Sequence, residues 1–256
     1  MVKTFNTVIT PYGLTRNVFL WLPDDWQTSG RRYPVTYMFD GHNLFYNETA
    51  TYGTCWGLLD YCQAHPDQII AAPECNHEGN GRLEEYSPYD LDAFGGIHGT
   101  GRQYLDWLTR EFKPALDAAY PTLPDRAHTA IAGSSMGGLM SLYAVTAYNA
   151  VFSRAACLSP SVRFCMEPLR RDLAKADLRP DTRIFLSWGE QESDAPRALA
   201  HYTANALEVC RALLARGADV CPYLQLGGRH CEASWAEQVP LYSRYLWEDR
   251  HGRKEK

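Results

Sequence analysis

The sequence predicts an α/β fold in which a mostly parallel central sheet of about eight strands carries helices on both faces. Apolar, β-rich runs alternate along the chain with runs of helical periodicity, and such alternation implies right-handed crossovers between parallel strands. The chain has 256 residues and 45% hydrophobic content, which is enough for one full core. We therefore expect a single domain over residues 1–256, without repeats or linkers.

Eight short runs have the composition of strands. They cover residues 7–10, 17–22, 33–39, 68–73, 128–132, 153–158, 183–188 and 220–226. The first two should pair antiparallel across the turn Pro11-Tyr12-Gly13. The third stops abruptly at Asp40-Gly41-His42-Asn43, as expected of a central strand that ends in a functional loop.

Helical spacing follows most of these strands. The expected helices cover residues 57–64, 104–119, 139–148, 167–176, 197–216 and 233–247. Residues 74–100 show little periodicity, and this stretch is too long for an idle connection. We interpret it as a wall or lid of the functional site; the alternative is an ordered surface loop with an internal Arg-Glu pair.

Charge and composition exclude several classes of partner. The net charge is −5 and the charges are interspersed, which argues against nucleic acid or an anionic membrane as a partner. The first six residues lack the apolar core of a signal peptide, and no run approaches the length of a membrane span, so we expect a cytoplasmic protein.

The chain contains eight cysteines but no C-x-x-C pair. Several lie in apolar segments, where a reduced cysteine behaves as a small buried hydrophobe. Disulfides or a metal site are the alternative interpretation. Because no zinc signature is visible and the histidines are scattered, we predict no metal and no cofactor.

A Gly-x-Ser-x-Gly motif spans residues 133–137, between a predicted strand and a predicted helix. This context is that of a nucleophile elbow, a strained turn that lifts the hydroxyl of Ser135 clear of the sheet. Gly133 and Gly137 remove the Cβ atoms that would clash in so tight a turn. The alternative is a glycine-rich connection that merely packs closely.

A serine hydroxyl needs a base, and the base needs an orienting acid. In elbow enzymes these follow the serine in the order acid, then histidine, each on a loop after a strand. His230 stands on a glycine-rich loop after the predicted strand 220–226. The acid comes from the loop after strand 183–188: Glu192 is the first choice, and Asp194 and Glu190 are the alternatives.

The oxyanion of a tetrahedral intermediate needs two backbone N–H donors that are already in place. One should come from Met136, directly after the serine. The other should come from the loop after strand 33–39, and we place it at His42. On this interpretation the side chain of His42 faces substrate or solvent.

Four stretches, residues 37–45, 82–88, 130–139 and 227–235, together resemble the putative esterase family of α/β-hydrolases. This group includes esterase D, the enterochelin esterases, the antigen 85 mycolyltransferases, and the feruloyl and acetyl-xylan esterases of carbohydrate esterase family 1. The resemblance implies the α/β-hydrolase fold, Ser135 as nucleophile, His230 as base and no metal cofactor. It also supports Glu192, although many relatives carry aspartate there, and it places the oxyanion donors at Met136 and His42.

The function that the resemblance implies is serine carboxylic-ester hydrolysis through an acyl-enzyme, on short-chain or aromatic acyl esters that include those of carbohydrates. Antigen 85-type acyl transfer, an S-formylglutathione hydrolase-like thioesterase and an inactive hydrolase-fold binding protein are the alternatives. The loop Asp40-Gly41-His42-Asn43 argues mildly against formylglutathione, and the lack of an arginine-rich cleft argues against a highly anionic siderophore.

The residues that contact this small-molecule substrate are expected at the mouth of the cleft, at Asn43 and within residues 46–56 and 74–100. Aromatic rings there could stack on a sugar or an aryl group, or could simply cover the core. Trp56, Tyr86 and Tyr89 are the aromatic candidates, and Asn43, Arg82 and Glu85 are the polar ones. The sequence does not indicate the oligomeric state of the protein.

Overall fold

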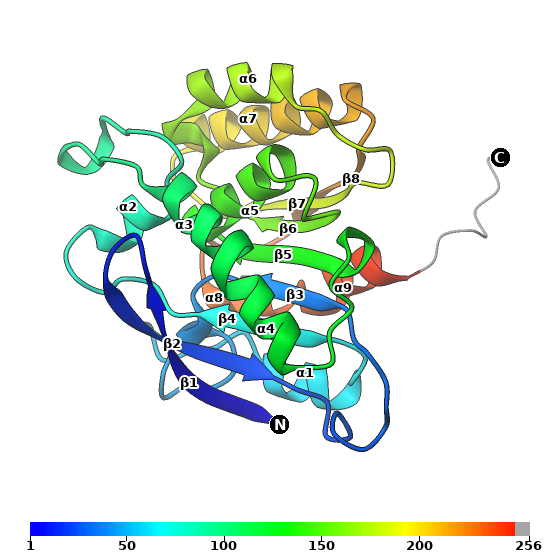
Figure 1. Ribbon diagram of the computed structural model, residues 1–256. Helices are drawn as coiled ribbons and strands as arrows, with labels where there is room; N and C mark the ends of the chain where they lie inside the picture. Colours follow the sequence, from blue (N-terminus) through cyan, green and yellow to red (C-terminus); the bar gives the residue numbers. More distant parts are fainter. Residues whose placement is uncertain (249–256) are drawn as a thin grey trace, which may run out of the picture.

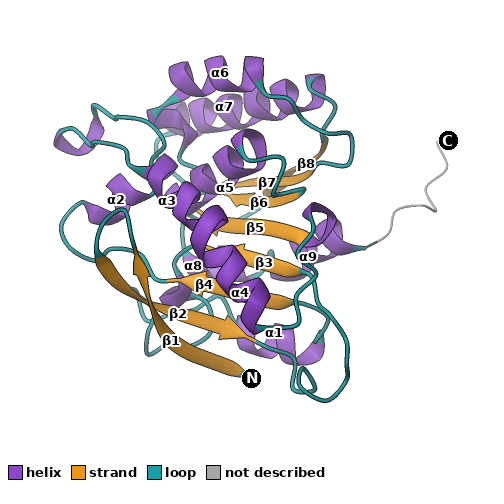
Figure 2. Cartoon of the chain, in the orientation of Figure 1, coloured by secondary structure: helices purple, strands orange, loops and turns teal. Residues whose placement is uncertain are grey.

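The computed structural model describes residues 1–248, and within them the strands form one eight-stranded sheet (Figure 2). Its order is β1-β2-β4-β3-β5-β6-β7-β8. The strands are β1 (Val2–Ile9), β2 (Leu14–Trp21), β3 (Val35–Met38), β4 (Ile69–Pro73), β5 (Thr129–Ser134), β6 (Arg154–Leu158), β7 (Arg183–Gly189) and β8 (Asp219–Gln225). β2 pairs antiparallel with β1 and β4, and all other pairs are parallel. The predicted fold class is therefore confirmed; residues 249–256 of the predicted domain lie outside the described part.

Helices cover both faces of this sheet (Figure 1). They are α1 (Leu58–Ala64), α2 (Gly81–Glu85), α3 (Gly101–Trp107), α4 (Lys113–Ala119), α5 (Met136–Ala147), α6 (Met166–Lys175), α7 (Pro196–Ala215), α8 (Glu232–Ala236) and α9 (Val239–Trp247). Helices α3 to α7 lie on one face, and α1, α8 and α9 lie on the other. None of the helices in residues 1–248 has the length and apolar character needed to cross a membrane.

The two faces of the sheet bury separate apolar clusters. Side chains alternate along a strand, so Ile131 of β5 packs under α5 whereas its neighbours Ala130 and Ala132 face α9. Helix α5 is buried from Met136 to Thr146. A strand run that is apolar on both faces, followed by a helix that is apolar all round, therefore belongs at the centre of the molecule.

Three of the differences between predicted and observed elements have a clear physical cause or change the element itself. Strand β1 begins at Val2 rather than at residue 7, because it pairs with β2 over its whole length at the edge of the sheet. The helix predicted at 233–247 is two helices, because Pro240 has no N–H to continue the hydrogen-bonding ladder. The helix predicted at 104–119 extends from α3 through one π-helical segment, η3 (Leu108–Phe112), into α4.

Residues 74–100 contain α2 and the short 3-10 helix η2 (Ala93–Gly95). Four of their apolar side chains, Tyr86, Tyr89, Leu91 and Ile97, are buried in the cluster under α3, whereas Phe94 is exposed. The stretch is thus fixed to the core along much of its length.

The parallel strands bring their carboxyl ends to one edge of the sheet. The loops after β3, β5, β7 and β8 contain the predicted oxyanion segment, serine, acid and histidine. Because parallel strands end at the same edge, four segments that are far apart in sequence are brought to one place.

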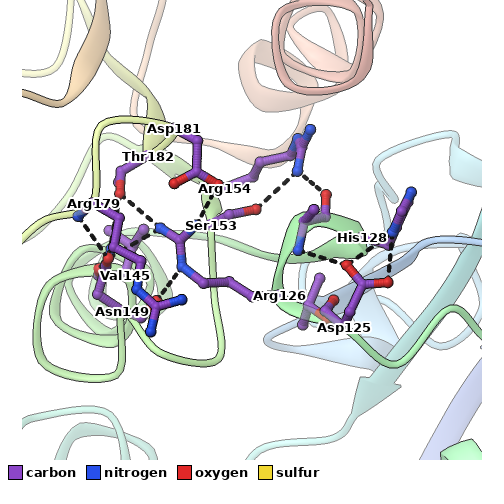
Figure 3. Close-up of polar contacts among 12 residues, drawn as sticks. Asp125, Arg126, His128, Val145, Asn149, Ser153, Arg154, Arg179, Asp181 and Thr182 are labelled. Atoms are coloured by element: carbon purple, nitrogen blue, oxygen red, sulfur yellow. Dashed lines mark hydrogen bonds and ion pairs between the residues drawn. The ribbon is translucent and has the colours of Figure 1, made fainter.

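The opposite edge is held by a buried polar network around Arg126 (Figure 3). Its guanidinium donates to the backbone oxygen of Asn149, to Asn149 Oδ1 at 3.0 Å and to Thr182 Oγ1 at 2.9 Å, and it pairs with Asp181. The Asn149 amide in turn donates to the Val145 carbonyl at 2.8 Å. One arginine therefore ties the end of α5 to the loop that enters β7.

We expect Asn149→Ala to lower the free energy of unfolding by about 2–3 kcal/mol, because the substitution removes the oxygen that accepts from Arg126 Nη2 and the Arg179 N–H, and the amide that donates to the Val145 carbonyl. Urea denaturation followed by circular dichroism measures this change. The control is Arg171→Ala, which removes an exposed arginine and should change the free energy by less than about 0.5 kcal/mol. Equal stability of the two variants would contradict the structural role of the network.

Candidate active site

Ser135 stands between the end of β5 and the start of α5, with φ 56° and ψ −117°. This left-handed conformation is costly for a residue with a Cβ, by about 1–3 kcal/mol. Hydrogen bonds on both sides hold it: the Ser135 N–H donates to the Leu158 carbonyl at 2.9 Å, and its own carbonyl accepts from Leu139 N–H at 3.0 Å. The turn has the geometry predicted from the sequence.

The glycines around Ser135 lie where no other side chain fits. A Cβ on Gly133 would lie 2.8 Å from the Gly137 carbonyl, and one on Gly137 would lie 2.9 Å from Phe39 Cβ. A Cβ on Gly138 would lie 2.7 Å from the Leu158 carbonyl oxygen. The two interpretations of the motif are therefore compatible, since the close packing of the glycines also supports the turn that presents the serine.

The structure brings Ser135, His230 and Glu192 into one hydrogen-bonded chain. Ser135 Oγ lies 2.9 Å from His230 Nε2, and His230 Nδ1 lies 3.2 Å from Glu192 Oε2. Of the alternative acids, Asp194 is exposed, and Glu190 accepts instead from the Gly227 N–H at 2.9 Å. Glu192 is thus the carboxylate that contacts the imidazole.

A backbone hydrogen bond connects the loop that contains Glu192 to the loop that contains His230. Gln191 N–H donates to the Gly228 carbonyl at 2.7 Å, and the Gly189 N–H donates to Glu192 Oε1 at 2.8 Å. A Cβ on Gly189 would lie 2.2 Å from the Gly228 oxygen, so only glycine permits this approach. The spacing of Gly189 and Glu192 in sequence therefore fixes the carboxylate opposite His230.

Glu192 is held in its ionised form. Burial alone would raise its pKa, but hydrogen bonds from His230, Ser159 and the Gly189 N–H outweigh burial, and the pKa lies below the ordinary value. The ring of Trp235 packs edge-on against His230, with centroids 5.1 Å apart, and its N–H donates to Ser159 Oγ at 3.0 Å. The imidazole is thus fixed on one side by the carboxylate and on another by the indole.

The loop after β3 folds into a single 3-10 turn, η1 (Gly41–Asn43). Asp40 precedes it with φ 57° and ψ 49°, and Asn43 N–H donates back to the Asp40 carbonyl at 2.8 Å. The first amides of a helix have no helical acceptor, which applies to His42 in η1 and to Met136 in α5. Both predicted oxyanion donors thus stand at such positions.

An ion pair with Arg82 of α2 holds Asp40. The guanidinium donates twice to the Asp40 carboxylate, at 2.7 Å in each contact. Burial opposes the charge, but Arg82 keeps the pKa of Asp40 below its ordinary value. The Tyr86 hydroxyl accepts from the Asp40 N–H at 3.3 Å. Residues 74–100 therefore position the predicted oxyanion loop.

The prediction for the His42 side chain is wrong. It is 3% exposed and points away from substrate and solvent. Its Nε2 lies 3.0 Å from Thr51 Oγ1, and its ring packs edge-on against His77, with centroids 4.6 Å apart. The short η1 turn directs this side chain into the protein.

A pocket of about 430 Å³ opens beside Ser135 and His230. It is lined by Asp40, Asn43, Thr51, Tyr52, Arg82, Ser134, Ser135, His230, Cys231, Glu232 and Trp235. Of the predicted substrate contacts, Asn43 and Arg82 therefore line the pocket. Trp56, Glu85 and Tyr86 are not among the lining residues.

The aromatic candidates of the sequence are core residues. Tyr86 is 0% exposed and packs edge-on against Phe39, and Tyr89 is also buried. Trp56 is 4% exposed and lies against Trp235, with centroids 6.0 Å apart. Their role as stacking surfaces is corrected to the alternative, which is covering the core, because tertiary packing leaves no face free for a ligand.

Glu85 is likewise a structural residue. It accepts from Arg16 of β2 at 2.8 Å and from the Asn76 N–H at 3.0 Å. The expected Arg-Glu pair within residues 74–100 does not form at Arg82 or Glu85. Arg82 pairs with Asp40, and Glu85 pairs with Arg16.

Outside the loop 40–43, six lining residues were not predicted as site residues from the sequence: Thr51, Tyr52, Ser134, Cys231, Glu232 and Trp235. Tyr52 is 79% exposed and belongs to the loop 46–56, which was expected at the cleft mouth. Glu232 and Trp235 follow the predicted base by two and five residues. Their position in the sequence could have identified them, because the first residues of the helix that follows His230 lie beside the imidazole.

The sequence model of the family described as "Putative esterase" matches residues 11–245. The chain belongs to this family. Uncharacterized protein YbbA of Bacillus subtilis (strain 168) is 25% identical over 232 residues, which cover 87% of this chain and 89% of the relative. The siderophore triacetylfusarinine C esterase of Aspergillus fumigatus is 26% identical over 216 residues, or 78% of this chain and 73% of that protein.

Solved structures of similar fold have low sequence identity. An IroE-like serine hydrolase from Shewanella oneidensis has a TM-score of 0.76 at 18% identity, covering 96% of this chain and 79% of that one. Siderophore hydrolase EstB from Aspergillus nidulans has a TM-score of 0.71 at 18% identity, covering 97% and 96%. A ferulic acid esterase has a TM-score of 0.65 at 19% identity, covering 96% and 97%. The protein has the α/β-hydrolase fold.

Glu192→Gln should destabilise the protein most near neutral pH. Because the folded pKa of Glu192 lies below 4.5, its ionised form stabilises the folded state above that pH, and this contribution is lost as pH falls from 4.5 through the folded pKa. The stability curves of wild type and variant should therefore converge on acidification. Thermal unfolding across this range measures the difference.

The matched control is Glu78→Gln, which replaces an exposed glutamate and should reproduce the wild-type curve. A constant gap between wild type and Glu192→Gln at all pH values would contradict the assigned charge state.

Proposed function

We propose that this protein is a serine carboxylic-ester hydrolase that works through an acyl-enzyme. The observation that supports this function best is the hydrogen-bonded chain Ser135–His230–Glu192 at the mouth of a pocket. Membership of the esterase family gives independent support.

In the first half of the reaction, Ser135 Oγ attacks the carbonyl carbon of the ester while His230 Nε2 takes the hydroxyl proton. The resulting oxyanion accepts hydrogen bonds from the Met136 and His42 amides. When the tetrahedral intermediate collapses, the imidazolium gives its proton to the departing alcohol. The acyl group then remains bound to Ser135.

In the second half, His230 removes a proton from water, and the hydroxide attacks the acyl carbonyl. Collapse of this second intermediate releases the carboxylic acid and returns the proton to Ser135 Oγ. Glu192 does not take a proton in either half; it holds the imidazole tautomer and stabilises the imidazolium. Its low pKa suits that role.

The pocket supports a polar, uncharged ester with a short or aromatic acyl group, including an ester of a carbohydrate. Tyr52 and Trp235 provide aromatic surface, and Asn43 and Glu232 provide polar groups. The basic side chain Arg82 is neutralised by Asp40. This charge balance disfavours a highly anionic ligand.

A siderophore ester is the second candidate. It is favoured by the similarity to the siderophore triacetylfusarinine C esterase and to siderophore hydrolase EstB. The same charge balance around Arg82 and Glu232 favours a neutral siderophore over an anionic one. Transfer of the acyl group to an alcohol, or cleavage of a thioester, would use the same acyl-enzyme.

Ser135→Ala and His230→Ala should each lower kcat/KM for 4-nitrophenyl acetate by about 10⁴-fold or more, because the nucleophile and its base act as a unit. Stopped assays with purified protein measure the rates, and circular dichroism checks the fold. Ser29→Ala and His98→Ala change an exposed serine and an exposed histidine and should keep wild-type rates. Full activity in either site variant, or no labelling of Ser135 by a fluorophosphonate, would refute the proposal.

Glu232→Gln should raise KM about 10-fold for acetylated xylo-oligosaccharides while changing kcat/KM for 4-nitrophenyl acetate less than about 2-fold, because a sugar hydroxyl can donate to this carboxyl, whereas the nitrophenyl group of the ester has no hydroxyl. Parallel kinetics on acetyl, butyryl, feruloyl and triacetylfusarinine esters rank the substrates. Equal effects on both substrates would rule out Glu232 as a contact for the alcohol.

A further inference from the structure

The loops after β3 and β4, at the edge of the sheet that carries the candidate active site, bring His42, Cys75 and His77 together. One atom from each, a ring nitrogen or the sulfur, lies within 4.8 Å of the others. His42 belongs to η1 after β3, and the other two follow β4. Because β3 and β4 are parallel neighbours, their loops meet at one edge, although 33 positions separate His42 from Cys75. Such a cluster has no local sequence spacing by which it could be recognised.

The outer nitrogens of both histidines already have partners. Nε2 of His42 lies 3.0 Å from Thr51 Oγ1, and Nε2 of His77 lies 3.0 Å from Glu74 Oε1. The Nδ1 atoms remain: that of His42 is buried without a hydrogen-bond partner, and that of His77 lies 4.0 Å from Cys75 Sγ. A carboxylate or hydroxyl behind each ring is the usual support of a metal-binding histidine.

We propose that His42 Nδ1, His77 Nδ1 and the Cys75 thiolate form a Zn²⁺ site, with water in the fourth position. A Cys-His-His donor set is one that zinc accepts, in tetrahedral geometry with bonds of about 2.0–2.3 Å. This geometry requires the three donor atoms to approach to about 3.3–3.8 Å. The side chain of His77 is 51% exposed and is the one free to make that movement.

Proton balance is simple for this site. Zinc replaces the thiol proton of Cys75, which is released to solvent, while both imidazoles bind as neutral ligands. The Glu74 carboxylate lies behind His77 and offsets part of the added positive charge, whereas the Asp40 carboxylate is already paired with Arg82.

One ligand of the proposed zinc site, His42, is also the residue whose backbone amide we predict in the oxyanion hole. Zinc on the His42 side chain would hold η1 from its inner side while the backbone faces the cleft. This link to ester hydrolysis rests on the proposed function, whereas metal binding itself does not.

The test uses untagged full-length protein that has been freed of metal with a chelator and titrated with Co²⁺. Wild type should bind one equivalent, develop the near-ultraviolet thiolate-to-cobalt absorption and lose it when Zn²⁺ is added. Cys75→Ser should abolish this absorption. His77→Ala, a change at a half-exposed position that the fold tolerates, should weaken Co²⁺ affinity by about 10-fold or more.

The controls are Cys55→Ser and His98→Ala, which remove a partly exposed thiol and an exposed histidine outside the cluster and should bind as wild type does. Absence of the absorption at one equivalent in wild type would overturn the proposal. So would its persistence in Cys75→Ser, or loss in Cys55→Ser. These readouts do not involve Ser135, so they stand or fall separately from hydrolysis.

Discussion

The left-handed backbone of Ser135 is the constraint on which the rest of the site depends. A side chain held at φ 56° is stable only where its surroundings enforce it, and here the sheet does so from one side and α5 from the other. Gly133, Gly137 and Gly138 allow the helix and the neighbouring strands to approach closely enough. Local strain and dense packing are thus two aspects of one arrangement, and the packed core offsets the cost of the turn.

A second close approach places the partners of this serine. The loops after β7 and β8 touch where Gly189 meets Gly228, and their backbone hydrogen bonds align Glu192 with His230. Both loops are anchored to adjacent parallel strands, so the separation of Glu192 and His230 is set by the spacing of the sheet. Precise geometry at the site therefore comes from the rigid scaffold beneath it.

The loop after β3 is constrained from two directions. The Arg82–Asp40 ion pair and the Tyr86 hydroxyl hold its first residue, while Thr51 and His77 hold the side chain of His42. Residues 74–100 supply most of these contacts. They act as a fixed support of the loop, and the same support assembles the cluster that we propose as a zinc site.

The α/β class, the order of the functional loops along the chain, and Ser135 and His230 as residues that meet were predictable from the sequence, because each of these features depends on a local strand pattern. The choice of Glu192 among the three carboxylates of its loop was decided by the fold, which places Glu192 against the imidazole and Glu190 against Gly227. Which aromatic residues face the pocket also depends on the fold. Trp56 and Tyr86 are buried and Tyr52 and Trp235 line the site, since burial depends on neighbours from distant segments. The same reason explains Glu85, which pairs with Arg16 of another strand, and the side chain of His42, which turns toward Cys75 and His77. Contacts between loops that are distant in sequence leave no periodic trace along the chain.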